Sequence, residues 1–140
     1  MAGVGDLPSQ RRLILDAGGI LAWADGNGDA RATIERARLG GYAIVIPSVV
    51  VAQVHRGGPD QARTDRIFKA VDAIVPTSVE IARRAGELLA AAGLADAVDA
   101  IVVAEALAAA PAIILTSDRP DIRRLLEGQA GAPLVAVVEV

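Results

Sequence analysis

Leu13-Ile14-Leu15-Asp16-Ala17-Gly18-Gly19 is a short apolar run that ends at a carboxylate and continues into two glycines. Such a run predicts a buried strand, and the glycines after it would let the backbone approach a ligand closely. Two other aspartates stand beside apolar runs: Asp99 precedes residues 100–104, and Asp118 follows residues 113–117. Because ligands of open α/β sheets bind beyond the carboxyl ends of the strands, these carboxylates are candidates for a common cleft.

Strand-like and helix-like segments alternate along the chain, which predicts an α/β fold with a largely parallel sheet. We expect strands at residues 12–15, 42–46, 72–75, 112–116 and 134–138. We expect helices at residues 18–24, 29–39, 48–55, 60–69, 78–92, 96–109 and 121–127, with Asp29, Ser78 and Asp96 or its neighbour as N-terminal caps. Right-handed crossovers would make this a three-layer α/β/α sandwich. A chain of 140 residues is expected to form a single domain, with residues 1–11 as a flexible N-terminal segment.

The composition restricts the class of protein. The chain is 53% hydrophobic but only 2% aromatic, so its core must be built from Ala, Val, Ile and Leu. No apolar stretch reaches the roughly 20 residues that span a bilayer, and no signal sequence is evident, so we expect a cytoplasmic protein without membrane association. The net charge of −3 does not indicate a general nucleic-acid coat. It is compatible with a nuclease, because acidic metal ligands offset basic residues elsewhere.

Several other kinds of active site lack support. The single histidine, His55, the absence of cysteine and the absence of a Gly-x-Ser-x-Gly motif argue against a nucleophilic triad and against zinc. Neither a dinucleotide-binding nor a P-loop glycine motif occurs. A receiver-like phosphoacceptor site would need an acidic neighbour for Asp16 and a lysine after a late strand, and the only lysine, Lys69, is misplaced.

The aspartates together predict a metal site. Asp96 and Asp99 are three residues apart and therefore share one face of the expected helix. Carboxylates that converge in one cleft repel one another unless they share a hard cation such as Mg²⁺ or Mn²⁺. Each acid also has a purely structural interpretation, since Asp16, Asp96 and Asp118 could simply be turn formers or helix caps. Their joint position favours a site for metal-assisted hydrolysis of a phosphate ester.

Four segments follow one another in a fixed order: LILDAGGILA at 13–22, IPSVVVAQV at 46–54, VDAIVVAEA at 98–106 and LTSD at 115–118. Their order and spacing resemble the PIN-domain family, and within it the VapC-type toxins of bacterial toxin–antitoxin modules, from about Arg12 to the last strand. The resemblance implies a PIN-like fold and a Mg²⁺- or Mn²⁺-dependent endoribonuclease that acts on RNA. It also implies a homodimer and a small antitoxin that wraps the toxin and inserts a basic side chain among the acids.

The resemblance also implies roles for particular residues. Asp16, Asp99 and Asp118 fall on acidic positions of the family and would hold the cation, while Asp96 would bind a metal-bound water or a second ion. The family usually has Glu at a further position, where this chain has Gln53. Gln53 would position water or substrate, and it brings a carbonyl oxygen without a negative charge. This difference leaves open a second function, a PIN-fold protein that binds RNA or a partner without efficient cleavage.

Three further residues are candidates for contacts with the substrate. Thr116 or Ser117 could steady Asp118 or a bound water. Arg56, beside the helix that carries the glutamine, is a candidate phosphate contact, and its alternative role is that of a solvated helix end. The small hydroxyl residue that the family has just after its first aspartate is absent, because Ala17 and Gly18 stand there.

Overall fold

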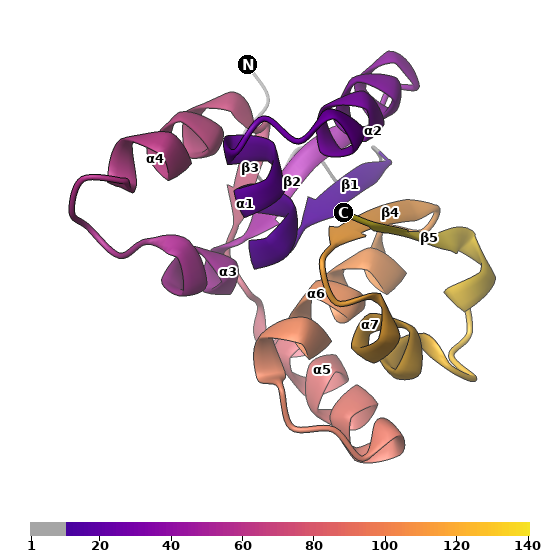
Figure 1. Cartoon of the computed structure of the whole chain (residues 1–140). Coiled ribbons are helices and arrows are strands. Elements are labelled where there is room, and N and C mark those ends of the chain that lie inside the picture. The colour runs from indigo at the N-terminus through magenta and orange to yellow at the C-terminus, as the bar shows by residue number, and fades with distance from the viewer. Residues whose placement is uncertain (1–10) are drawn as a thin grey trace.

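The computed structural model describes residues 11–140, so the expected flexible N-terminal segment lies almost entirely outside the described residues. Helices and strands alternate along the chain, as expected (Figure 1). The strands are β1 (Arg12–Leu15), β2 (Ala43–Pro47), β3 (Ala73–Val75), β4 (Ala112–Thr116) and β5 (Val135–Glu139). The helices are α1 (Ala17–Ala24), α2 (Gly28–Leu39), α3 (Ser48–Val54), α4 (Gln61–Ala70), α5 (Val79–Ala92), α6 (Ala97–Ala108), α7 (Arg119–Leu126) and the short 3₁₀ helix η2 (Ala132–Leu134).

The five strands form one sheet in the order β3-β2-β1-β4-β5. Every strand pair is parallel, and at the centre Ile14 of β1 is in register with Val45 of β2 and Ile114 of β4. Helices α1 to α4 lie on one side of the sheet and α5 to α7 on the other (Figure 1). The predicted three-layer α/β/α sandwich with a parallel central sheet is therefore confirmed.

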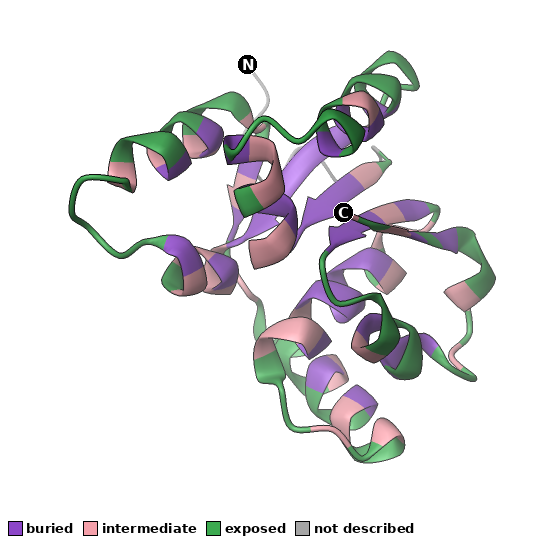
Figure 2. Cartoon of the chain, viewed as in Figure 1, coloured by how far each residue is buried: buried purple, intermediate pink, exposed green. Residues whose placement is uncertain are grey.

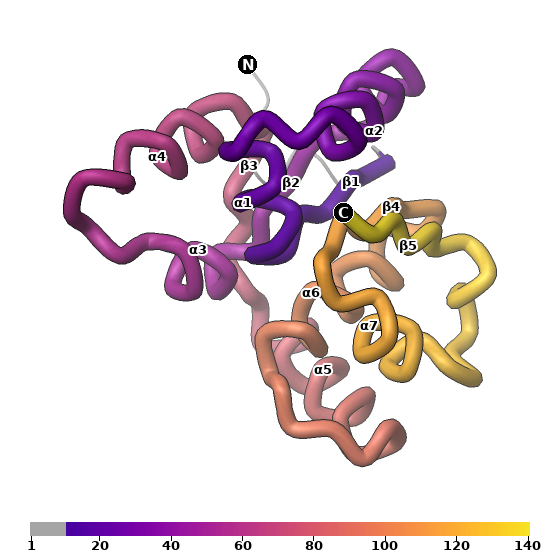
Figure 3. Tube along the Cα trace, in the orientation of Figure 1, coloured from indigo at the N-terminus to yellow at the C-terminus, as the bar shows by residue number. Residues whose placement is uncertain are grey.

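The strand order creates a switch point between β1 and β4. From β1 the chain adds β2 and β3 outward in one direction, and then crosses back through α5 and α6 to place β4 on the other side of β1. The segment after β1 therefore enters a helix on one face, and the segment after β4 enters a helix on the opposite face. Figure 3 shows that the start of α1 and the end of β4 lie side by side although about 100 residues separate them. Ligands of open α/β sheets bind at such a point.

The core is aliphatic, and all five strands contribute to it (Figure 2). Leu13, Ile14 and Leu15 of β1 have no solvent exposure, as expected for a central strand covered by helices on both faces. Helix α6 is buried along most of its length because it packs on β1 and β4 and is covered by α5 and α7. The apolar run that follows Asp99 is helical, and its place in α6 between the sheet and two other helices explains why it is apolar. No helix within residues 11–140 combines the length and the apolar character needed to cross a membrane.

The helix caps differ from expectation at one place. Helix α2 begins at Gly28, and the side chain of Asn27 caps it by accepting a hydrogen bond of 2.9 Å from the N–H of Ala30. The prediction of Asp29 as the cap was wrong, because that residue already lies inside the first turn. The caps at Ser78 and Asp96 are confirmed. The other predicted element boundaries differ from the observed ones by at most two residues.

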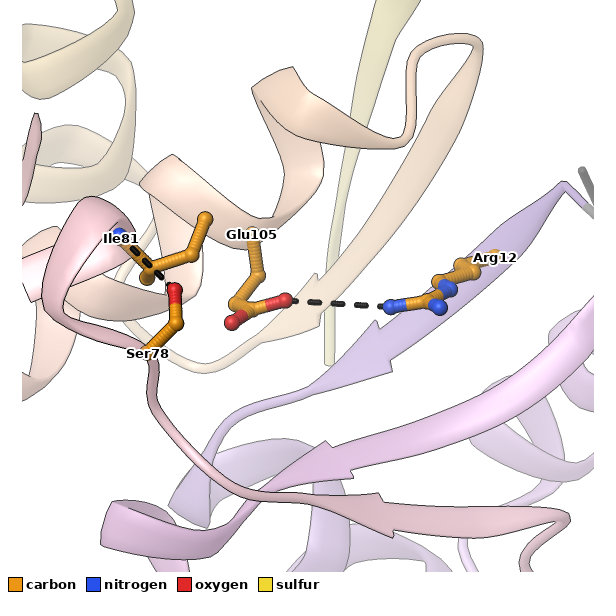
Figure 4. A network of polar contacts seen from close by, with 4 residues as sticks. All are labelled: Arg12, Ser78, Ile81 and Glu105. Carbon is orange, nitrogen blue, oxygen red and sulfur yellow. Dashed lines mark hydrogen bonds and ion pairs between the residues drawn. The ribbon is translucent and has the colours of Figure 1, made fainter. Parts of the chain in front are cut away.

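A buried ion pair joins β1 to α6 on the α5–α6 side of the sheet. Nη1 of Arg12 lies 3.8 Å from Oε2 of Glu105, and the two side chains are 13% and 8% exposed. The pair lies beside the Ser78 cap of α5 (Figure 4). Burial raises the pKa of the Glu105 carboxyl, and the positive charge of Arg12 offsets only part of that effect. Because Arg12 begins β1 and Asp16 follows its last residue, the pair lies toward the opposite end of the sheet from the aspartates.

Candidate metal centre

Three helices begin where the carboxyl ends of β1 and β4 meet. Asp16 is the N-cap residue of α1, Asp118 occupies the N-cap position of α7, and Asp99 lies in the first turn of α6. A helix N-terminus carries partial positive charge from its unpaired N–H groups, so each of these positions favours a carboxylate. The fold thus explains both why acids stand at these places and why they come together.

Asp16 is the most buried of the acids, with 5% exposure. One of its carboxylate oxygens accepts a hydrogen bond of 2.9 Å from the N–H of Gly19, and the other accepts one from the hydroxyl of Thr116. Burial raises the pKa of Asp16, and these hydrogen bonds lower it again in part. The interpretation of Asp16 as a helix cap is therefore correct, and the same contacts fix the orientation of its carboxylate toward the neighbouring strand end.

Thr116 connects the ends of the two central strands. Its side chain is wholly buried, and its hydroxyl donates to Asp16 while accepting a hydrogen bond of 2.9 Å from the N–H of Asp118. Thr116 therefore acts through the two aspartates, and its hydroxyl does not face solvent. The next residue, Ser117, is exposed beside Asp118.

The glycines after Asp16 permit a close packing contact between α1 and β4. A Cβ on Gly18 would lie 2.0 Å from the Oγ and 2.5 Å from the Cβ of Ser117. A Cβ on Gly19 would lie 2.5 Å from the carbonyl oxygen of Leu115. Both separations are shorter than side-chain atoms tolerate, so α1 can approach β4 this closely only without side chains here. This contact with β4 gives the glycines a structural role, and their close approach to a ligand stays a prediction.

Asp99 lies at the centre of the acidic group. Its side chain is partly buried, and burial raises its pKa to about 7, with further contributions from the negative charges of Asp96, Asp16, Asp118 and Asp121. An acid with these neighbours holds its proton near neutral pH unless a positive charge is supplied.

Asp96 is engaged in capping α6. Its Oδ1 accepts hydrogen bonds of 3.0 Å each from the backbone N–H groups of Val98 and Asp99. Its side chain is exposed. The structural interpretation of Asp96 as a cap is thus correct, and its second carboxylate oxygen is left for a bound water or ion.

A third aspartate joins Asp99 and Asp118. One carboxylate oxygen from each of Asp99, Asp118 and Asp121 lies within 4.8 Å of the other two. Asp118 makes no capping hydrogen bond with its side chain, although it occupies the N-cap position of α7. Asp121 stands at the start of the helix expected at residues 121–127, and the sequence alone assigned it no role in the metal site. Its spacing of three residues from Asp118, the same spacing that links Asp96 and Asp99, indicates that the two side chains share one helix face, whereas the proximity to Asp99 depends on tertiary packing.

Two other candidate residues lie on or just after α3. Gln53 is partly buried in the last turn of this helix, which packs against α1 and the end of β2. No hydrogen bond within residues 11–140 links its side chain to the acids. Arg56 is exposed, and its guanidinium donates a hydrogen bond of 3.0 Å to the carbonyl oxygen of Ala52 at the end of α3. That contact fits the alternative interpretation of Arg56 as a solvated helix end.

The model of the PIN-domain family matches residues 13–125 of the chain. The chain belongs to the PIN-domain family. In fold, this PIN domain is similar to a chain in the crystal structure of VapBC2 from Rickettsia felis bound to a DNA fragment from their promoter. The two chains are 18% identical and superpose with a TM-score of 0.67, covering 91% of this chain and 98% of the other. No curated protein matches the sequence.

Proposed function

We propose that this PIN-domain protein is a Mg²⁺- or Mn²⁺-dependent endoribonuclease that acts as the toxin of a toxin–antitoxin pair. The observation that carries the proposal is the group of carboxylate oxygens within 4.8 Å of one another, formed by Asp99, Asp118 and Asp121 at the switch point of the sheet. Membership of the PIN-domain family, whose members are generally metal-dependent nucleases, supports the nuclease activity. The fold of the VapBC2 chain supports the toxin assignment.

The residues present fit a hard divalent cation. Oxygen donors are what Mg²⁺ and Mn²⁺ prefer, and the oxygens of the group are close enough to share one ion. Asp16, Asp99 and Asp118 would hold the cation, and the free oxygen of Asp96 would hold a bound water or a second ion. When bound, the cation supplies a water nucleophile at neutral pH and neutralises charge that develops on the phosphate.

The protein's own side chains would release a proton, orient the ligands and admit the substrate. Asp99 must release its proton before it can serve as a ligand, because its pKa is about 7. Thr116 and Gly19 orient the carboxylate of Asp16 through their hydrogen bonds. Asp118 is exposed, so a polymeric substrate can reach the group from its side. Ser117 beside it is available to contact the substrate directly.

Gln53 and Arg56 complete the proposed substrate site. The amide of Gln53 would position the attacking water or the RNA, and it leaves the site with one charge fewer than a glutamate would provide. Arg56 would contact a phosphate of the RNA, which requires its guanidinium to leave the carbonyl oxygen of Ala52. The family resemblance implies an RNA substrate, a small antitoxin and a second copy of this chain as partners. We expect the protein to act on them in the cytoplasm.

The presence of Gln53 favours one alternative, a PIN-fold protein that binds RNA or a partner and cleaves poorly. Calorimetric titration with Mg²⁺ and Mn²⁺ separates the two functions. A nuclease is expected to show saturable binding of at least one ion, whereas a protein that only binds RNA is expected to show none near working concentrations.

Digestion of total RNA tests the proposal directly. The purified protein is incubated with total cellular RNA in the presence and absence of Mg²⁺, and the new ends are mapped. We expect discrete new ends that require the metal. Intact RNA after incubation with the folded protein and Mg²⁺ would reject the nuclease and leave the binding protein.

A further inference from the structure

We propose that Asp121 is a direct ligand of the catalytic cation, together with Asp99 and Asp118. This inference rests on the proposed function, and it assigns a role to a residue outside the ligand set that the family resemblance implies. It would also supply the negative charge that Gln53 lacks, because Asp121 would be a fourth carboxylate beside Asp16, Asp99 and Asp118.

The distances between the carboxylate oxygens fit one shared cation. Carboxylate oxygens of Asp99, Asp118 and Asp121 already lie within 4.8 Å of one another, although they come from two helices. Oxygens bound to one hard cation lie about 2.0–2.6 Å from it, so two ligands on opposite sides are about 4–5 Å apart. The three side chains therefore fit around one ion with little change of the backbone.

Asp99, Asp118 and Asp121 differ from Asp16 and Asp96 in the partners of their carboxylates. Asp16 is held by Gly19 and Thr116, and Asp96 is held by the start of α6. By contrast, no hydrogen bond or ion pair within residues 11–140 ends on the carboxylates of Asp99, Asp118 or Asp121. Three unpaired carboxylates this close together repel one another, and a shared cation removes that repulsion.

The local structure of α7 fixes two of the three ligands. Helix α7 begins at Arg119, so Asp118 and Asp121 are three residues apart across its first turn and share one face. The buried residues Ile122 and Leu125 anchor the helix, and the backbone N–H of Asp118 is tied to Thr116. The pair is therefore presented to Asp99 by a helix start that is anchored in the core.

Calorimetric titration of the full-length chain with Mn²⁺ at pH 8 tests the inference, with Asp121→Asn as the variant. Asp29→Asn is the matched control, because Asp29 is an exposed acid in the first turn of α2. We expect Asp121→Asn to weaken Mn²⁺ binding by at least about tenfold, since even the outer partners of metal ligands are worth about 10–100-fold. The control should bind Mn²⁺ as the wild type does.

A second readout separates a ligand from a structural acid. If Asp121 only stabilised the start of α7, its replacement should lower the melting temperature in EDTA, as we expect for the control. If it is a ligand in a repulsive group, the melting temperature of Asp121→Asn in EDTA should stay equal or rise, and the stabilisation by Mn²⁺ should shrink. Wild-type Mn²⁺ affinity in Asp121→Asn would overturn this inference alone. Absence of Mn²⁺ binding by the wild type would overturn the proposed function with it.

Discussion

The hydroxyl of Thr116 donates a hydrogen bond to the buried carboxylate of Asp16, across the ends of two neighbouring parallel strands. The same oxygen accepts from the backbone N–H of Asp118. One wholly buried side chain thus sets the relative positions of two candidate metal ligands that lie about 100 residues apart in sequence.

Thr116→Val should remove this link while preserving the shape of the side chain. We expect the free energy of unfolding to fall by about 1–3 kcal/mol, because a buried carboxylate and a partly buried N–H each lose a partner. The pKa of Asp16 should rise further, since the lost bond is one of those that lower it. Urea denaturation and the carboxyl carbon resonance of Asp16 measure the two effects. Thr116→Ser is the control and should restore most of both, whereas equal behaviour of the two variants would argue against the link.

The pKa of Asp99, about 7, predicts that the metal-free protein loses stability as the pH rises. The unfolded chain ionises this acid near its ordinary pKa of 3.8, so between about pH 4 and pH 7 the folded state keeps a proton that the unfolded state has released. The free energy of unfolding in EDTA should therefore fall across that window. Urea denaturation at several pH values measures the slope, and Asp99→Asn should flatten it. An identical slope in this variant would contradict the raised pKa.

The same titration predicts how metal binding depends on pH. A cation must displace the proton of Asp99 at pH values below about 7, so Mn²⁺ affinity should fall by up to about tenfold for each pH unit below that value. Above pH 7 the affinity should level off. Calorimetry at pH 6 and pH 8 measures the difference, and affinities that agree at the two pH values would show that Asp99 is already ionised at pH 6.

The close approach of α1 to β4 predicts opposite effects of two glycine substitutions. Gly19→Ala places a Cβ 2.5 Å from the carbonyl oxygen of Leu115, so α1 must move and the protein should lose about 1–3 kcal/mol of stability. Gly86→Ala is the control, because Gly86 lies inside α5 with open space around it. It should gain about 0.5–1 kcal/mol. Thermal or urea denaturation compares them, and a stabilising Gly19→Ala would refute the packing argument.

The Arg12–Glu105 pair predicts that removing one partner lowers the free energy of unfolding strongly, whereas replacing both partners by apolar residues lowers it little. Glu105→Ala leaves the partly buried guanidinium of Arg12 without its only ion-pair partner within residues 11–140 and should cost about 3–5 kcal/mol. The double variant Arg12→Met with Glu105→Leu should be much closer to the wild type, because apolar side chains avoid the desolvation of both charges. Urea denaturation orders the variants. A double variant less stable than Glu105→Ala would show that the pair itself stabilises the fold.

Much of the fold could be predicted from the sequence, because apolar runs of strand length alternate with longer segments bounded by Gly, Pro and capping residues. The run of residues 112–116 was predicted at its observed boundaries. The cap of α2 was mistaken, because Asn27 and Asp29 are both good capping residues two positions apart and only the backbone decides between them.

The candidate site was only partly predictable. The positions of Asp16 and Asp118 follow from parallel strands whose carboxyl ends meet, and that can be inferred from the pattern of segments. The proximity of Asp121 to Asp99 depends on how α7 begins and how it packs against α6, which no local pattern records. The role of Gly18 and Gly19 likewise depends on a strand distant in sequence.

Cleavage of a defined RNA by the wild type and by Asp99→Asn, each with Mg²⁺ and with EDTA, tests whether the acidic group is a nuclease centre. Asp29→Asn serves as the control for loss of an exposed helix N-terminal acid. We expect Mg²⁺-dependent cleavage by the wild type and by the control, and none by Asp99→Asn, whose circular dichroism and melting temperature should show an intact fold. Undiminished cleavage by a clean preparation of Asp99→Asn would contradict the assignment of the acidic group as the nuclease centre.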